Sequence, residues 1–156
     1  MIQRIQTLFL VLAAVVLSMA FFFPLITYID GQVWLEVFLK GIKDNSAPVF
    51  GLSNKLLLPL QIINGITILL AIASVFLFKN RKSQMKMVRM GIVLTLVNIA
   101  LVFFYFANVL ARITSMAPDF NHTAIYLILV GLVMFVMANR FIMKDEKLVK
   151  AADRLR

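Results

Sequence analysis

Long apolar stretches separated by short polar ones dominate the pattern of this chain. Four stretches are close to or above about 20 residues, the length that an α-helix needs to cross about 30 Å of hydrocarbon. None has an acidic residue or a lysine at its centre, and they cover residues 7–26, 56–78, 88–110 and 124–143. The pattern therefore predicts an all-α membrane protein built as a bundle of four transmembrane helices.

The first stretch also has features of a cleavable signal peptide. Arg4 precedes the apolar run, and Ser18 and Ala20 imitate the small residues of a cleavage site. The apolar run nevertheless continues through residues 21–26, which makes it longer than a usual signal core. We therefore expect this stretch to be retained as a transmembrane helix.

Residues 27–55 form the longest connection, between the first and the second stretch. The segment contains two apolar runs, residues 31–42 and 47–54, which are separated by a turn-like cluster at residues 43–46, and the first run has residues of high β-propensity. We therefore predict a small β-hairpin on the outer membrane surface. An interfacial helix is the alternative, because Trp34 and Phe38 are four residues apart and would share one helical face.

The tail after the last stretch, residues 144–156, has a helical pattern. Glu146 precedes Lys150 by four residues, which is a favourable pair on a helix. Apolar residues recur there at helical spacing, at Leu148, Ala151, Ala152 and Leu155. We expect the tail to continue the fourth span as an amphipathic cytoplasmic helix.

The composition supports the membrane interpretation and argues against an enzyme. The chain has 156 residues, of which 62% are hydrophobic and 15% charged, and its mean hydropathy is +0.96. A soluble domain contains about 25% charged residues. Cysteine is absent, and His122 beside Asp119 provides too few ligands for a specific metal site. No phosphate-binding glycine loop or HExxH motif occurs, so we expect no catalytic residue, metal or cofactor.

Positive charge gathers on one side of the predicted topology. If the N-terminus is cytoplasmic, twelve of the sixteen Lys and Arg residues lie inside, together with the whole net charge of +9. The positive-inside rule therefore predicts that both termini are cytoplasmic. Residues 78–90 hold five of these cations but only one aromatic residue, Phe78, which belongs to the second span. We expect this loop to contact the lipid bilayer and not a nucleic acid.

A few uncharged polar residues lie at membrane depth. Those of the third stretch follow steps of three and four residues and would form one stripe along the helix. We expect the intramembrane polar residues to join neighbouring helices by hydrogen bonds, and a polar chamber between the second and third helices is the alternative. The residues are Gln61, Asn64, Thr95, Asn98, Tyr105 and Asn108.

Three segments of the chain resemble a known family. They are "MIQRIQT" at the start, "FKNRKSQ" after the second stretch and "ANRFIMKDEKLVKAADRLR" at the end. They resemble the signatures of a bacterial four-span membrane family that is classed as a domain of unknown function. The resemblance covers essentially the whole chain. It implies a multi-pass inner-membrane protein of Bacteroidota-type bacteria. It does not imply a catalytic residue at any position of this chain.

The matching positions lie on the predicted cytoplasmic side and include amides and acids that the charge rule does not require. We therefore expect a non-catalytic accessory or structural subunit that docks on membrane-protein partners through this face. A small carrier or lipid-binding protein that uses the polar stripe is the alternative, and a self-assembled structural protein is a third class. The expected docking residues are Gln3, Arg4, Asn80, Arg81, Lys82, Asn139, Arg140, Asp145, Glu146 and Arg154.

Overall fold

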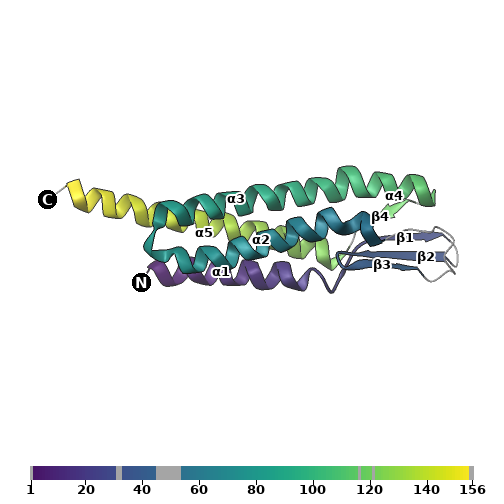
Figure 1. The fold of residues 1–156 in the computed structure, drawn as a ribbon, viewed down its shortest axis with the longest axis horizontal. Coiled ribbons are helices and arrows are strands. Elements are labelled where there is room, and N and C mark those ends of the chain that lie inside the picture. Colours follow the sequence, from purple (N-terminus) through teal and green to yellow (C-terminus); the bar gives the residue numbers. More distant parts are fainter. Residues whose placement is uncertain (1, 31–32, 45–53, 116, 121, 155–156) are drawn as a thin grey trace.

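The computed structural model describes residues 2–30, 33–44, 54–115, 117–120 and 122–154. An elongated bundle of helices carries a small β-sheet at one end (Figure 1). The helices are α1 (Ile2–Met19), α2 (Leu58–Phe76), α3 (Arg81–Ala100), α4 (Ala107–Thr114) and α5 (Thr123–Arg154).

Three shorter helical elements complete this pattern. The 3-10 helix η1 (Asn54–Leu57) precedes α2, and η2 (Leu77–Lys79) follows it. The π-helix η3 (Leu101–Phe106) joins α3 to α4, so residues 81–114 form one continuous helical segment. Both chain termini and the connection from α2 to α3 lie at the end opposite to the sheet (Figure 1). We call residues 77–89 and 139–150 the basic end, and the opposite end of the bundle the sheet end.

Three helical segments of the described chain are long and apolar enough to cross a membrane. They are Lys55–Phe76, Arg81–Thr114 and Thr123–Val149. They overlap the second, third and fourth predicted spans, which supports a membrane protein of mostly helical structure. The segment that contains α3 has 34 residues and is about 50 Å long, so it extends beyond the hydrocarbon layer.

The first predicted span was too long at its outer end. Residues 7–26 were expected to form one helix, but α1 ends at Met19 and strand β1 begins at Pro24. Proline has no backbone N–H and disfavours helical geometry in the residue before it, so the helix cannot continue through this position without a break. The remaining 18 residues of α1 are about 27 Å long, close to the thickness of the hydrocarbon layer.

Close contacts at two glycines set the spacing of the helices. A Cβ atom on Gly91 of α3 would lie 2.6 Å from the ring of Phe135 on α5. A Cβ atom on Gly131 of α5 would lie 2.8 Å from the side chain of Leu17 on α1. Small residues allow helices to approach closely where no hydrophobic effect drives them together. The core of the bundle therefore depends on large side chains that fit against glycines of a neighbouring helix.

The sheet has four antiparallel strands in the order β3-β2-β1-β4. The segment after α1 forms β1 (Pro24–Asp30), β2 (Val33–Phe38) and β3 (Gly41–Asp44). Strands are thus present as expected, but the predicted hairpin was misplaced, because β1 precedes it and β3 overlaps the turn expected at residues 43–46. The two-residue strand β4 (Pro118–Asp119) comes from the connection before α5. The segment around Trp34 is thus a strand, and the interfacial-helix alternative was wrong. Residues 45–53 of the predicted loop lie outside the described part.

Strand β1 attaches the sheet to the helices. Tyr28 is fully buried, and its hydroxyl group donates a hydrogen bond to the carbonyl oxygen of Ala107, at 3.1 Å. Burial raises the pKa of Tyr28 to about 12, because the charged phenolate is poorly solvated there. The sheet is therefore a packed part of the fold and not a loose outer loop.

Candidate functional site at the basic end

The polar residues predicted inside the bundle do not all lie there. Asn64, Thr95 and Asn98 are each 1% exposed, and Gln61 is half-buried. The amide nitrogen of Asn64 donates to the carbonyl oxygen of Leu17 at 3.2 Å, and this bond ties α2 to α1. This hydrogen bond is the kind of interhelical contact that holds transmembrane bundles together.

The π-helix explains why the other two residues are exposed. A stripe that includes Tyr105 and Asn108 assumes 3.6 residues per turn along the whole segment. In η3 the backbone bonds instead span five residues, as in the bond from Ala107 N–H to the carbonyl oxygen of Val102. Phe106 is therefore the buried residue of this turn, whereas the side chains of Tyr105 and Asn108 are exposed on the outside of the bundle. These two residues do not pack inside the bundle, contrary to the sequence-based expectation.

Asn98 differs from the other buried polar residues. Thr95 donates to the carbonyl oxygen of Gly91 within its own helix, at 2.8 Å. Neither the amide nitrogen nor the amide oxygen of Asn98 has a hydrogen-bond partner among the described residues. An unpaired buried polar group costs about 1–3 kcal/mol. Asn98 is therefore not explained by hydrogen bonding between the helices.

Two glutamines that belong to the family-like segments connect helices near the basic end. Gln6 Nε2 donates to the carbonyl oxygen of Phe141, at 3.2 Å, and joins α1 to α5. Gln84 Nε2 donates to the carbonyl oxygen of Ser74, at 3.0 Å, and joins α3 to α2. Both side chains are buried. The amides of these two members of the family-like segments therefore serve the packing of this chain.

The expected docking residues also include groups that interact with one another. Asn80 is the N-cap of α3, where its side chain accepts a hydrogen bond from the backbone N–H of Ser83, at 3.3 Å. Arg81 forms an ion pair with Asp145 of α5, at 3.3 Å. These contacts fix the start of α3 against the last part of α5. The position of Asp145, which the charge rule did not explain, is accounted for by this pair.

A basic cleft lies beside this ion pair, between α3 and α5. Its volume is about 270 Å³, and its lining comprises Lys82, Met85, Lys86, Arg89 and Glu146. The guanidinium of Arg89 lies 3.0 Å from the sulfur of Met85, within α3. Three cations and one acid thus line the cleft, which favours an anionic group.

Only part of this cleft was predictable from the sequence. Lys82 and Glu146 were among the expected docking residues, whereas Lys86 and Arg89 were assigned only to topology. The available signal was the spacing of residues 82, 86 and 89, which places them on one helical face.

Asn139 and Arg140 do not line the cleft. The side-chain oxygen of Asn139 is buried and accepts no hydrogen bond from the described residues. Arg140 is exposed. The side chains of Gln3, Arg4 and Arg154 lie outside the described part. Among the side chains that the structure describes, no group of three or more His, Asp or Glu residues is placed to hold a metal ion.

The comparisons with known proteins give one family. A family model described as "Domain of unknown function (DUF4293)" matches residues 2–155. No curated protein and no solved structure matches the chain. The match confirms the resemblance to a family of unknown function that the sequence had indicated.

Proposed function

The chain belongs to the DUF4293 family of unknown function, and we propose that it is a non-catalytic accessory or structural subunit of a larger membrane assembly. In this proposal the basic end is the docking surface. The protein resides in the bacterial inner membrane, with both termini in the cytoplasm and the sheet on the outer side. The distribution of charge supports this orientation, because twelve of the sixteen cations belong to segments at the basic end or next to it.

The observation that carries the proposal is the projection of α5 beyond the rest of the bundle. With 32 residues, α5 is about 48 Å long, compared with about 30 Å of hydrocarbon. Its last turns extend past the start of α1 and past the connection between α2 and α3 (Figure 1). Leu148 and Val149, on this projecting part, are 51% and 41% exposed. An apolar surface next to a basic cleft suits a protein partner with an apolar patch and acidic neighbours.

Cross-linking followed by mass spectrometry of the full chain in a mild detergent tests the docking surface. The double variant Leu148→Gln/Val149→Gln keeps good helix formers but removes the apolar surface. We expect recovery of a stoichiometric partner to fall at least about tenfold, as for residues that dominate an interface. Ile29→Thr is the matched control, because Ile29 is an exposed apolar residue at the sheet end.

The same experiment contains the result that would contradict the proposal. If the double variant and Ile29→Thr recover the same proteins in the same amounts, the projecting helix is not a docking element. A homogeneous particle that contains only copies of this chain would instead identify a self-assembled structural protein.

Absence of cysteine makes the orientation directly measurable. Ile29→Cys places a single thiol on the sheet, and Leu148→Cys places one on the projecting part of α5. A membrane-impermeant maleimide is applied to cells whose outer membrane is permeabilised and whose inner membrane is intact. It should label the thiol at position 29 at once, and the thiol at position 148 only after the inner membrane is broken. The reverse pattern would invert the topology and remove the cytoplasmic docking surface.

A small carrier is the second candidate function, and Asn98 is the observation that favours it. Its buried amide has no partner among the described residues and could bond to a ligand or to water inside the bundle. A purified single copy that binds a small polar molecule, with binding abolished by Asn98→Leu, would support the carrier over the accessory subunit.

A further inference from the structure

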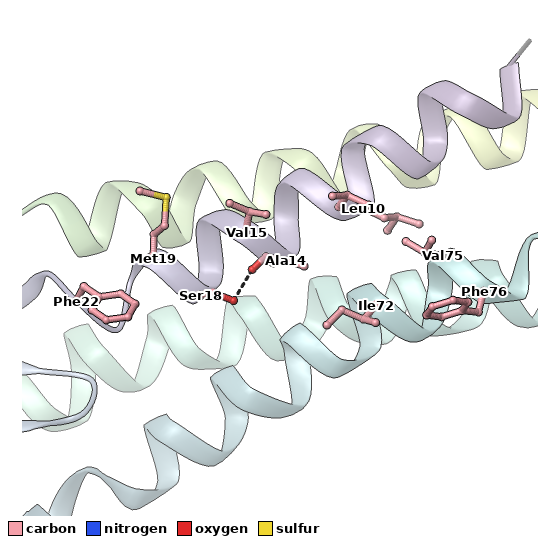
Figure 2. Close-up of a pocket in the computed structure, with 10 residues that line it drawn as sticks. Leu10, Ala14, Val15, Ser18, Met19, Phe22, Ile72, Val75 and Phe76 are labelled. Carbon is pink, nitrogen blue, oxygen red and sulfur yellow. Dashed lines mark hydrogen bonds between the residues drawn. The ribbon is translucent and has the colours of Figure 1, made fainter.

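An apolar groove lies on the outside of the bundle, between α1 and α2. Its volume is about 520 Å³. Figure 2 shows that α1 and the residues after it supply Leu10, Val15, Ser18, Met19 and Phe22, while the last residues of α2, such as Phe76, supply the other side. The hydroxyl group of Ser18 donates to the carbonyl oxygen of Ala14, at 2.7 Å, so the groove presents almost no free polar group. Its occupant must therefore be apolar along most of its length.

The α1 part of the groove is about as long as one leaflet of a bilayer. From Leu10 to Met19 the axis of α1 rises about 14 Å, and half of the hydrocarbon thickness is about 15 Å. The α2 part comes from the last residues of that helix, Ile72–Phe76, so the groove reaches from the sheet side past the membrane centre toward the basic end. The groove ends at Phe22, just before β1 begins at Pro24. Its open end is therefore near the membrane surface on the side of the sheet.

A cation is placed at this open end. Lys40 belongs to the turn between β2 and β3 and is exposed. Its Nζ lies 5.6 Å from the centre of the Phe22 ring and 6.0 Å from that of Phe38. These cation–π contacts hold the ammonium group beside the groove. Lys43 lies nearby, 4.9 Å from the Phe38 ring, but Glu36 is its partner in the strand register.

The lining of the groove favours a flexible acyl chain over a helix of another protein. Bulky side chains, such as Met19 and Phe76, border the groove, whereas close helix packing in membranes prefers small residues. An acyl chain with a negatively charged headgroup satisfies both the apolar lining and the cation at its end.

We propose that the groove and Lys40 form a binding site for one anionic phospholipid of the leaflet on the sheet side. One acyl chain occupies the groove between α1 and α2, and the phosphate of the headgroup pairs with the ammonium group of Lys40. The site is independent of the docking surface at the basic end, since the two share no residue.

Native mass spectrometry of the delipidated full chain tests the site, with two lipid probes of identical acyl chains. Phosphatidylglycerol carries a net negative charge and phosphatidylcholine carries none. We expect one phosphatidylglycerol per chain, bound about fivefold more tightly than phosphatidylcholine, which is the factor for one lysine near a headgroup. Lys40→Gln should abolish this preference, and it should weaken the binding of phosphatidylglycerol more than that of phosphatidylcholine, whose phosphate is partly neutralised by its own choline group. Arg112→Gln is the control, because Arg112 is an exposed cation in α4, the last helix before the sheet-end connection.

A second pair of variants tests the groove itself. Val15→Trp and Met19→Trp fill it from positions that are exposed to lipid, so the bundle can accommodate both. Each should weaken binding of both lipids by at least about tenfold, since the chain loses its apolar contact area. Leu69→Trp is the control, because Leu69 is exposed on α2 and does not line the groove.

Three results would overturn the proposal. The first is equal binding of the two lipids by the wild-type chain, and the second is an equal loss in Lys40→Gln and Arg112→Gln. The third is a change of particle mass in Val15→Trp with lipid binding unaltered, because that would make the groove an interface with a second copy or with another protein. Thermal unfolding of every variant shows whether a loss of binding reflects a loss of the fold.

Discussion

The sheet end and the basic end of the bundle differ in how far their polar and apolar side chains are buried. At the sheet end, Tyr28 and Leu35 are fully buried, and the Tyr28 hydroxyl group bonds to the backbone of α4. At the basic end, Leu148 and Val149 are exposed on a projecting helix, and three cations line an open cleft. One end therefore completes the fold, whereas the other presents groups that this chain leaves accessible.

This difference in burial predicts different effects of substitutions at the two ends. Changes at the sheet end remove contacts that the fold itself makes, and so they should lower stability. Changes at the basic end remove groups that contribute little to stability, and so they should affect partners. Thermal and denaturant unfolding in a mild detergent, compared with recovery of partners, separates these two classes of effect.

The largest expected effect is the truncation of a buried leucine of the sheet. Leu35→Ala leaves a cavity and should lower the free energy of unfolding by about 2–5 kcal/mol. Leu148→Ala at the basic end is the matched control, because its side chain is half-exposed, and it should change stability by less than about 0.5 kcal/mol. Equal losses in the two variants would show that both ends belong to the folded core.

A smaller effect is expected for two asparagines in the membrane. Asn64→Leu removes the bond to the carbonyl oxygen of Leu17 and should lower stability by about 0.6–2 kcal/mol. Asn98→Leu removes an amide that has no partner among the described residues, so it should leave stability unchanged or raise it. A clear loss of stability in Asn98→Leu would reveal a partner such as a bound water molecule or a second copy.

Much of the fold could be predicted from the sequence, because the length of an apolar run and the β-propensity of a loop are local properties. The helical spans and the presence of strands after the first span follow from them, whereas the turn was expected at residues 43–46, where β3 lies. The end of α1 was misplaced because residues 20–26 are as apolar as a transmembrane helix, and only Pro24 indicates the change to a strand. Strand β4 could not be found, since two residues carry no periodic signal.

The candidate site was predictable only in part, because it depends on contacts between distant elements. The cations of residues 82–89 were visible, but their cleft requires Glu146 from α5. The exposure of Tyr105 depends on the π-helix, which shifts the buried face without a signature in the hydrophobic pattern. The bonds of Gln6 and Gln84 could not be predicted, because a sequence does not show which backbone carbonyl oxygen an amide meets.

The next largest expected loss of stability follows from removal of the Tyr28 hydroxyl group. Tyr28→Phe loses the bond to Ala107 and should lower stability by about 1 kcal/mol at neutral pH. The pKa of Tyr28 is raised from 10.0 to about 12, so its burial as the neutral phenol is fully favourable below pH 10. As the pH rises from 10 to about 12, the unfolded chain loses this proton first, and the wild type should lose stability that Tyr28→Phe does not lose. Parallel pH profiles of unfolding for the two proteins would show that Tyr28 is accessible to water.

The smallest expected effect is at the ion pair of the basic end. Arg81 and Asp145 are 29% and 15% exposed, and such partly solvated pairs contribute at most about 1 kcal/mol. Asp145→Asn and Arg81→Gln should each lower stability slightly, and the loss should shrink at high salt because ions screen the pair. The double variant should lose no more than one single variant, since the two residues act through one contact. Additive losses would mean that each residue has a separate partner, and Asp145 would then belong to the docking surface after all.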